Sequence, residues 1–453
     1  MHQNGMTPGE RRATFSLAAI YALRMLGLFL ILPVFALYAH DHLPGSTPML
    51  IGLAIGAYGL SQAVLQIPFG MLSDRIGRKP VIIAGLLIFA VGSVVAALAD
   101  SITGVIVGRA LQGSGAIAAA VMALAADLTR EEHRTKAMGV IGMTIGVSFA
   151  LALIAGPVLS GWIGVPGIFW LTAVLALGGI AVLRFGVPQP VESHFHRDTE
   201  AMPVKFMGVL KDVELLRLNF GILVLHAMLT ASFVALPFAL RDQAGLAAGQ
   251  HWQVYFPVLV IALVLMVPFI IVAEKKRRMK EVFVGAIVLL GLSQLTLLLL
   301  YDSVAGITLA LLMFFISFNV LEASLPSLIS KAAPVDGKGT ALGIYSTSQF
   351  LGAFIGGIAG GTLYGAYGFI GVFTLCAVLA GAWAAVASAM ASPRYLKSHL
   401  LKVGSMDDNQ ARVLTERIRQ VPGVVEVVVA EGTAYLRVDA QLLDEAALSE
   451  FSK

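Results

Sequence analysis

Long runs of apolar residues alternate with short polar segments along most of the chain. Each run is near or above the roughly 20 residues that an α-helix needs to cross a bilayer at about 1.5 Å per residue. The pattern therefore predicts twelve membrane-spanning helices, at residues 14–39, 49–72, 79–98, 101–127, 136–161, 166–186, 216–240, 251–273, 281–300, 304–330, 339–364 and 369–391.

The amino-acid composition supports a membrane protein built from these helices. Of the 453 residues, 58% are hydrophobic and 13% are charged, and the mean hydropathy is +0.85. These values exclude a soluble globular protein and indicate an all-α polytopic membrane protein. The first run follows Arg11 and Arg12 and has no small-residue cleavage site, so we expect it to stay as the first helix.

Lysine and arginine gather in alternate loops between the predicted helices. The loops at 75–79 and 275–280 are strongly basic, whereas those at 40–48 and 301–303 have neither residue, and Arg241 is the exception. Because short cytoplasmic loops are enriched in these residues, the pattern predicts that both termini are cytoplasmic. This orientation signal also accounts for the net charge of +4, so we expect no nucleic acid or other acidic partner.

The chain divides near its middle into two similar halves. Residues 187–215 interrupt the apolar pattern and leave six predicted helices on each side, which suggests a duplication. Pro68, Asp74, Arg75 and Arg78 correspond to Pro268, Glu274, Lys275 and Arg278, each 200 positions later, and Gly156 and Gly161 correspond to Gly360 and Gly365, 204 positions later. The predicted domains are a six-helix bundle at 1–186, a cytoplasmic linker at 187–215, a second bundle in parallel orientation at 216–392 and a cytoplasmic domain at 393–453.

The turn at residues 70–80 carries the most specific motif of the chain. Its sequence, GMLSDRIGRKP, matches the loop signature GxLaDrxGrkxx at nearly every defined position. With the parallel repeats, this motif resembles the major facilitator superfamily of secondary transporters over about residues 10–392. The segment from Arg109 to Gly115 is similar to a second family signature in the fourth helix.

The fifth predicted helix is similar to the glycine–proline signature of the drug/proton antiporter branch. Gly156, Pro157 and Gly161 preserve its core, whereas Ser160 and Ala152 stand where glycine is usual. Alanine and serine are still small enough for close helix approach. The resemblance therefore implies an antiporter, and the facilitator and symporter branches stay open.

The same turn predicts a conformational latch. Gly70 and Gly77 permit a tight turn and close helix contact. Asp74 could accept hydrogen bonds from the first N–H groups of another helix, and the family resemblance implies that this is the eleventh helix, beginning at 338–340. We expect Asp74 to dock there when the cytoplasmic side is closed, within a charge network of Arg75, Arg78 and Arg134. The alternative, a solvated turn that only orients the helices, explains the basic residues but not the aspartate or the glycines.

Four ionisable side chains stand out inside the predicted helices, where burial is costly unless the group is paired or serves transport: Arg24, Arg109, His226 and Glu322. We predict Glu322 as the proton carrier, because it could alternate between protonated and ionised states as a cavity opens and closes. His226 could share the proton or bind substrate, or be a neutral structural group. Arg109 could drive proton release from a nearby carboxylate or form a fixed pair with it. Asp127 is either a second titrating acid or a helix-end residue.

Substrate contacts are expected from broken, cavity-facing helices near the midplane. The candidates are Tyr21, Arg24, Gln62, Gln66, Phe233, Asn319, Tyr345 and Gln349. The sequence shows no nucleophile, metal or cofactor constellation, so we expect neither an enzyme nor a bound metal or cofactor, with the proton gradient as the energy source. The single cysteine, Cys376, is expected to be a packing residue.

The segment after the last predicted helix has the pattern of a small α+β domain. An alternating stretch at 396–403 and an amphipathic helix at 407–419 precede strands at 424–430 and 433–438 and a helix near 443–451. This order is close to a ferredoxin-like fold. The segment resembles heavy-metal-associated domains, but its first loop, at 404–409, has no cysteine, so thiolate metal binding is not expected. Regulation, docking onto the cytoplasmic face or self-association through strand edges is expected instead.

These patterns predict a secondary active transporter that works by alternating access. The resemblance implies a multi-pass protein of a bacterial inner membrane and, through the antiporter branch, proton-coupled efflux of a small drug-like molecule. A proton-independent or symport uptake transporter is the first alternative. A membrane sensor that uses the C-terminal domain is the second.

Overall fold

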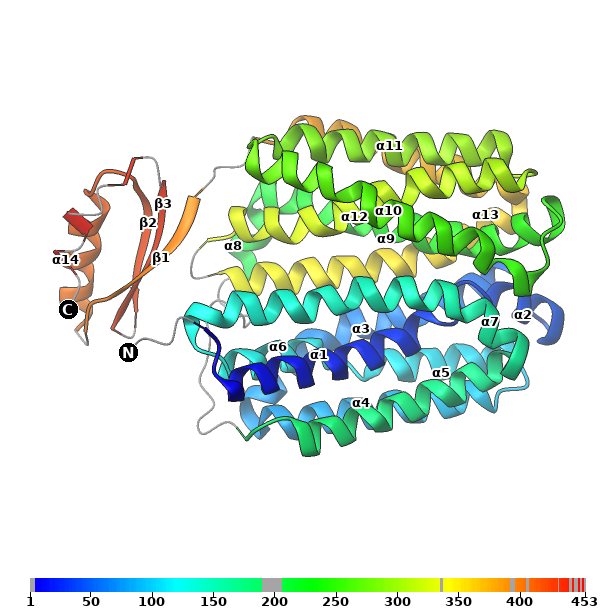
Figure 1. The fold of residues 1–453 in the computed structure, drawn as a ribbon, viewed down its shortest axis with the longest axis horizontal. Helices are drawn as coiled ribbons and strands as arrows, with labels where there is room; N and C mark the ends of the chain where they lie inside the picture. The colour runs from blue at the N-terminus through cyan, green and yellow to red at the C-terminus, as the bar shows by residue number, and fades with distance from the viewer. Residues whose placement is uncertain are drawn as a thin grey trace.

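A computed structural model of the chain describes residues 5–189, 206–334, 337–391, 396–404, 407–430, 432–439, 442–443, 447–448 and 450–451. Its helices form one elongated bundle, and a small sheet domain lies beyond one end of it (Figure 1). The start of α1 and the C-terminal domain both lie at that end, which we call the terminal face. The opposite end, where α2 (Phe35–His42) lies, is the distal face (Figure 1). Most of the predicted linker, at 190–205, is outside the described residues.

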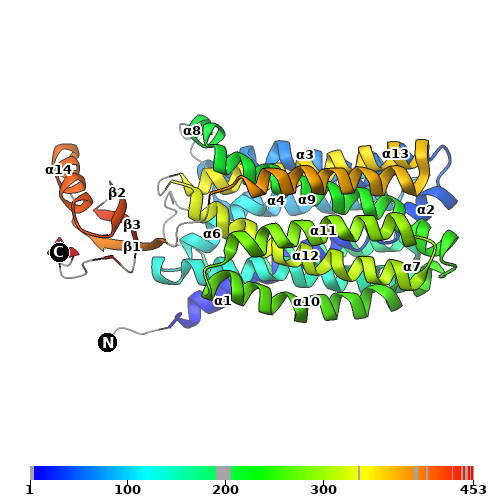
Figure 2. The ribbon, with the colours of Figure 1, turned by 90° about the horizontal axis from the view of Figure 1, so that it is seen from above.

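Ten helical segments of the described chain are long and apolar enough to cross a membrane. They are α1 (Pro8–Phe29), α3 (Pro48–Ile76), α4 (Arg78–Ala97), α5 with α6 (Ile102–Ser114 and Ala118–Asp127), α7 (Glu131–Gly186), α9 with the π-helical η2 (Val213–Phe238 and Ala239–Gln243), the 3-10 turn η3 with α10 (Ala248–Gln250 and Trp252–Lys275), α11 (Met279–Leu300), α12 (Val304–Ala332) and α13 (Lys338–Ser388). A short helix, α8 (Phe206–Lys211), precedes α9. The side views in Figures 1 and 2 show these long helices running nearly parallel to one another.

Two of these segments, Lys136–Gly186 within α7 and Lys338–Ser388 in α13, are 51 residues long and reverse direction inside. Each turns at a glycine with a positive φ angle, Gly164 (φ 68°) and Gly368 (φ 61°), a conformation that other residues rarely adopt. Each segment is long enough for two crossings of about 20 residues. Twelve crossings stay the prediction, with α7 and α13 each supplying two.

The two halves repeat one packing arrangement. Gly368 lies 204 positions after Gly164, which is the offset of the second sequence correspondence. In the first half α1 packs along α7, and in the second half α9 packs along α13. Gly156 of α7 meets the backbone of Leu30, and Gly360, its counterpart 204 positions later, meets the backbone of Ala231.

Two of the predicted helices are broken rather than continuous, so the expectation for 14–39 and 101–127 is wrong in this respect. The first ends at Phe29 and resumes as α2 at Phe35, across a turn that contains Pro33. Proline has no backbone N–H and its ring blocks the preceding turn of helix, which explains the interruption. The fourth breaks at residues 115–117, where a side chain on Gly115 would lie 2.2 Å from the carbonyl oxygen of Gly85.

The C-terminal domain is a three-stranded antiparallel sheet with one described helix. Its elements are β1 (Leu396–Lys402), α14 (Asp408–Arg419), β2 (Val424–Ala430) and β3 (Thr433–Asp439), and β3 lies between β1 and β2. The predicted helix and both predicted strands are confirmed within one residue at their ends. Alternate residues of β3, including Leu436, are buried against Ile418 of α14. The ferredoxin-like assignment stays a prediction, since much of the expected last helix lies outside the described residues.

The C-terminal domain contacts the helix bundle through Arg437. One of its terminal nitrogens donates hydrogen bonds to the carbonyl oxygens of Ser330, at 3.0 Å, and Lys331. These carbonyls belong to the last turn of α12, where helix carbonyls have no intrahelical donor. Arg437 therefore caps a long helix of the second half with a charged group.

Gly156 gives a test of the broken first helix. A side chain at position 156 would lie 2.5 Å from the carbonyl oxygen of Leu30 and 2.9 Å from Cγ of Pro33, whereas Gly161 of the same motif has no atom within 4 Å of that position. We expect Gly156→Ala to destabilise the protein by about 1–3 kcal/mol through overpacking. Gly161→Ala should be neutral or slightly stabilising, because alanine favours the helix over glycine. Thermal unfolding of both purified variants in one detergent checks this, and equal midpoints would contradict the packing argument.

Candidate functional site

Three side chains from separate helices of the second half meet inside the bundle. The Gln349 amide nitrogen (α13) donates a hydrogen bond to Oε1 of Glu322 (α12) at 3.2 Å and lies 2.9 Å from Nε2 of His226 (α9). Because an amide nitrogen only donates, this ring nitrogen must accept, which places the imidazole proton on Nδ1. Nε2 of His226 also lies 4.0 Å from the second carboxylate oxygen of Glu322. The arrangement connects one acid and one base through an amide that can rotate.

Several polar atoms of this cluster have unused hydrogen-bonding capacity. Oε2 of Glu322, Nδ1 of His226, Nδ2 of Asn319 and the hydroxyl of Tyr345 are buried without a partner among the described residues. Buried polar atoms in proteins are nearly always paired, and leaving one unpaired costs about 1–3 kcal/mol. A cluster of such atoms therefore indicates a place where a proton, water or ligand completes the bonding.

An aromatic layer separates this cluster from the distal face. Phe318 precedes Glu322 by one helical turn on the distal side, and its ring stacks on Phe149 of α7 with centroids 5.8 Å apart. Phe149 meets Phe29 of α1 edge to face at 5.0 Å, and the His226 ring lies 5.8 Å from Phe318. Phe149 and Phe318 are both buried, whereas the Glu322 side chain is 32% exposed. The layer joins helices of both halves directly beside the acid.

On the distal side of this layer, the two halves touch backbone to backbone. Gly52 of α3 packs on Gly357 of α13 so closely that a side chain on Gly52 would lie 1.9 Å from a carbonyl oxygen. Gly59, two turns further along α3, makes a similar approach to Phe350. At the distal face itself, Arg241 of η2 pairs with Asp41 of α2 across the two halves. The distal half of the bundle is therefore closed.

The first half holds a second polar cluster made of arginines and amides. Arg24 is fully buried and donates to Oε1 of Gln62 at 2.8 Å and to the carbonyl oxygen of Gly115 at 3.1 Å, which the break between α5 and α6 leaves available. Arg109 donates to Gln112 at 2.7 Å. Both guanidinium groups lie over the ring of Tyr58, at 5.7 and 5.2 Å from its centroid. No carboxylate pairs with either arginine within the described part of the chain.

The predicted coupling residues are thus distributed over three places. Glu322 and His226 lie together with Gln349 from the predicted substrate contacts. Asn319 lies about one turn before Glu322 on α12, and Tyr345 about one turn before Gln349 on α13. Arg109 lies in the arginine–amide cluster, and Asp127 lies near the terminal face. The other predicted contacts are buried within their own halves: Tyr21, Arg24, Gln62 and Gln66 in the first, and Phe233, which packs on Tyr255, in the second.

Asp127 belongs to the charged turn rather than to the Glu322 cluster. Arg78 pairs with Asp74 of the same turn, and its Nε lies 3.4 Å from Oδ2 of Asp127. The side chains of Arg78 and Asp127 are 2% and 0% exposed. Gly77 has a φ of 97°, so the turn requires this glycine. Arg134, which follows Asp127 by seven positions and lies at the start of α7, is also buried. Arg75 is exposed.

The expected docking of Asp74 on residues 338–340 is not seen in this conformation. Within the described residues, the ion pair of Asp74 is with Arg78. Glu274, the counterpart of Asp74 in the second half, instead binds Lys331 at 2.9 Å and Ser327 at 3.2 Å, both on α12. The two turns therefore make different contacts, and the docked latch stays a prediction about another conformation.

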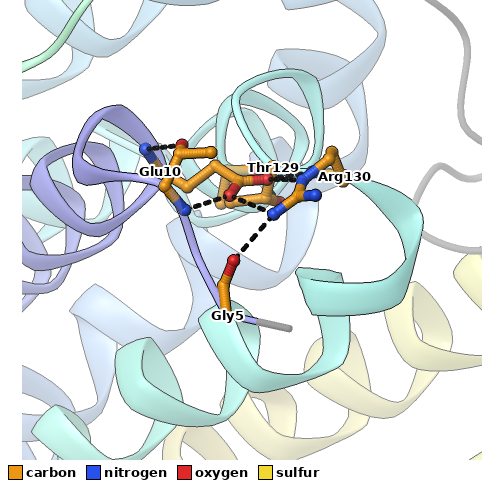
Figure 3. A network of polar contacts seen from close by, with 6 residues as sticks. Gly5, Glu10, Thr129 and Arg130 are labelled. Carbon is orange, nitrogen blue, oxygen red and sulfur yellow. Dashed lines mark hydrogen bonds and ion pairs between the residues drawn. The ribbon is translucent and has the colours of Figure 1, made fainter. Parts of the chain in front are cut away.

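Sequence reasoning missed an ion pair that fastens the first helix to the start of α7. Glu10 receives hydrogen bonds from the side chain and the backbone N–H of Arg130, both at 2.9 Å, and Arg130 also donates to the carbonyl oxygen of Gly5 (Figure 3). Thr7 and Glu10 form a reciprocal capping box at the start of α1. The spacing of Thr7 and Glu10 was the available signal for the cap, but nothing local indicates Arg130 as partner.

Comparison with known proteins gives consistent similarities over almost the whole chain. The family model of the Major Facilitator Superfamily matches residues 17–334 and 258–421. The chain is 48% identical over 445 residues to the inner membrane transport protein YajR of Escherichia coli (strain K12), covering 98% of this chain and 97% of that protein.

Solved structures show the same fold at low sequence identity. A bacterial homologue of the human lysosomal transporter Spinster, in an inward-facing and occupied conformation, superposes with a TM-score of 0.70 at 14% identity, over 85% of this chain and 97% of its own. The human organic anion transporter MFSD10 superposes with a TM-score of 0.62 at 18% identity, over 84% and 100%.

The distal ion pair predicts a pH-dependent stability. Partial burial tends to raise the pKa of Asp41, but hydrogen bonds from His40 and Arg241, with the charge of Arg241, hold that pKa below its ordinary value. A carboxyl whose pKa is lowered on folding stabilises the folded state above the unfolded pKa, and this contribution is lost as the pH falls through the folded pKa. We expect Asp41→Asn to cost about 1 kcal/mol or less at neutral pH, since the pair is partly exposed, and nothing in acid.

Thermal unfolding at neutral and acidic pH measures this difference. Asp302→Asn is the control, because Asp302 is an exposed distal acid with no ion pair among the described residues. An Asp41→Asn penalty that persisted unchanged in acid, or an equal penalty for Asp302→Asn, would refute the assignment.

Proposed function

This chain belongs to the major facilitator superfamily, and from that premise we propose that it is a proton-coupled secondary active transporter that exports a small molecule across a bacterial inner membrane. Its relatives are named as transporters rather than enzymes. The observation that carries the proposal is the Glu322–Gln349–His226 cluster, which places a titratable acid beside a neutral base in the middle of an apolar bundle. The energy source is then the proton gradient, without a cofactor.

The hydrogen bonds of the cluster support proton exchange at Glu322. In the described arrangement Gln349 donates to Glu322, which favours the ionised carboxylate. When Glu322 takes up a proton, its hydroxyl becomes a donor, and Nε2 of His226, 4.0 Å away, could accept from it once the Gln349 amide turns away and releases the lone pair of that nitrogen. While Glu322 is ionised, the unpartnered atoms of Asn319 and Tyr345 are available to bind substrate polar groups. The proton and substrate would thus compete for one small region.

The closed distal half supports alternating access with the terminal face open. The glycine contacts between α3 and α13 and the aromatic layer block the distal route, so Glu322 would exchange with the terminal side in this conformation. The basic loops support a cytoplasmic location for that side, with both termini inside and twelve crossings between them as part of the proposal. Export then follows if the substrate binds from this side when Glu322 is ionised, and leaves on the distal side when Glu322 is protonated.

The charged turn supports a latch that holds the opposite conformation. Arg78 keeps Asp74 and Asp127 within the first half while the terminal face is open. Closure would bring the start of α13 to Asp74, whose carboxylate could accept hydrogen bonds from N–H groups of the first turn of that helix. Gly70, which already lies against Ala119, would keep the helices close enough for this exchange.

A regulatory or sensory role for the C-terminal domain is a second candidate. Arg437 binds the last carbonyls of α12, and α12 also carries Glu322. Ligand binding or self-association of the domain would therefore act on the helix that holds the proposed proton carrier. Uptake by symport or without protons is the other alternative, and it uses the same fold.

Glu322→Gln tests the coupling. Proteoliposomes that contain a pH-sensitive dye and the probe ethidium, extended to a panel of small organic molecules, are exposed to an imposed pH gradient. We expect gradient-driven substrate movement in the parent and movement at the level of empty liposomes in Glu322→Gln, because the amide cannot take up the proton. Glu281→Gln is the matched control, since Glu281 is an exposed acid at the start of α11.

The outcomes of this experiment separate the alternatives. Protons and substrate moving in opposite directions support antiport, and movement in the same direction supports symport. Flux that ignores the gradient supports uniport, and no flux with any compound supports the sensor. Parent-like coupled flux in Glu322→Gln would remove Glu322 as the carrier.

Asp74→Asn tests the latch. We expect slower transport and a smaller population with the terminal ends of α3 and α13 close together, measured by distances between spin labels on those ends. The control is Glu274→Gln, at the corresponding position of the second half, which should have a smaller effect because Glu274 bonds within its own half. Normal insertion with parent-like transport and label distances for Asp74→Asn would rule out the latch.

A further inference from the structure

A groove of about 540 Å³ lies at the terminal face between the first turn of α4 and the last turn of α7. It lies outside the Glu322 cluster and the charged turn's ion pairs. Its wall combines two cationic side chains with apolar ones: Lys79, Arg184, Pro80, Ile83, Leu183 and Phe185. A groove with this composition fits a ligand that has an anionic end and an apolar body.

The two cations of the groove have no counter-charge in the described structure. The Lys79 ammonium donates a hydrogen bond to the carbonyl oxygen of Val187 at 2.7 Å, and neither Lys79 nor Arg184 has a carboxylate partner there. The two positive charges also repel each other. Arg12 adds a third positive charge beside them, because it donates to the carbonyl oxygens of Phe185 and Gly186 at 2.8 and 3.0 Å. An anion bound between Lys79 and Arg184 would relieve this repulsion.

The groove continues into apolar surface that faces away from the bundle. On α4 the exposed side chains beyond the groove are Leu87 and Val91, at 45% and 57% exposure. On α7 they are Leu177 and Val174, at 51% and 61%. In a membrane-spanning helix, apolar side chains exposed in this way face lipid chains. The cations therefore lie where these lipid-facing stripes end, at the level of the headgroups.

We propose that this groove is a binding site for an anionic phospholipid, whose phosphate lies between Lys79 and Arg184 and whose acyl chain follows the stripes on α4 and α7. Inorganic phosphate shares the charge, but it would leave the apolar wall uncovered, so the lipid is the occupant. The total charge of the chain predicted no acidic partner. The placement in one groove of two cations that have no carboxylate partner among the described residues changes that expectation for this site.

The proposal requires that the chain is embedded in a membrane, but not the direction or the coupling of transport. A failed flux experiment and a failed lipid experiment are therefore distinguishable. The ammonium of Lys79 keeps one hydrogen bond to the protein, which leaves its other two N–H groups for phosphate oxygens. The Arg184 side chain is exposed, and its planar guanidinium can bind two oxygens at once.

The experiment compares lipid binding to the purified full-length protein by native mass spectrometry and by thermal unfolding. Phosphatidylglycerol should remain bound at collision energies that remove phosphatidylcholine, and it should raise the unfolding midpoint. Millimolar inorganic phosphate should do neither. In the double variant Lys79→Gln/Arg184→Gln, we expect roughly 25-fold weaker phosphatidylglycerol binding, since each of the two basic residues near a membrane surface contributes about a factor of five to anionic lipid affinity.

A matched control removes the same number of charges from the same face. Lys275 and Lys276 are exposed at the end of α10 and outside the groove, so Lys275→Gln/Lys276→Gln should retain the parent's phosphatidylglycerol binding. Equal loss in both double variants would show a general surface-charge effect and overturn the site. Equal retention of phosphatidylglycerol and phosphatidylcholine by the parent, or stabilisation by inorganic phosphate alone, would also overturn it.

Discussion

A polar group inside an apolar helix bundle has no bulk water to pair with, so the protein itself must supply its partner. The two halves meet this constraint differently. In the first half, Arg24 and Arg109 are bound by glutamines, backbone carbonyls and the ring of Tyr58, so that two positive charges are held without an acid among the described residues. In the second half, Glu322 and His226 share a single amide and leave polar atoms unpaired. Nε and Nη1 of Arg24 are also buried without a partner among the described residues, so the two clusters differ in chemistry rather than in satisfaction. A guanidinium only donates hydrogen bonds, whereas a carboxyl and an imidazole can exchange a proton.

Glycines and helix breaks allow the helices that carry these polar groups to pack closely. At the break between α5 and α6, the carbonyl of Gly115 accepts from both Arg24 and the N–H of Ile117, and the break after α1 leaves Leu30 and Pro33 against Gly156. Gly52 and Gly357 let α3 and α13 touch at the backbone and close the distal half. Close packing of this kind is the main source of helix association in a membrane, where burial of apolar surface supplies little. The motif glycines are therefore packing positions for specific neighbours.

The Arg and Lys side chains at the terminal face have several separate structural roles. Arg78 pairs with two acids in the first half, and Lys331 binds Glu274 in the second. Arg437 connects the C-terminal domain to the last turn of α12. Lys79 and Arg184 remain without an acid within the described chain and line a groove next to lipid-facing helices. The basic residues at the terminal face therefore make four different kinds of contact, although the sequence pattern indicated only the orientation of the chain.

The sequence by itself determined the features that depend on neighbouring residues. Apolar run length predicted where helices lie, and alternation predicted β2 and β3 within one residue. The 204-residue offset found for Gly156 and Gly360 also relates Gly164 and Gly368, where the structure turns the chain. The sequence also singled out Glu322, His226 and Gln349, because a polar residue in an apolar run is visible locally. Which of these side chains meet was decided only by the tertiary structure. Asp127 pairs with Arg78, Arg109 with Gln112, and Glu10 with Arg130, since helix packing brings together residues whose separation along the chain carries no local signal.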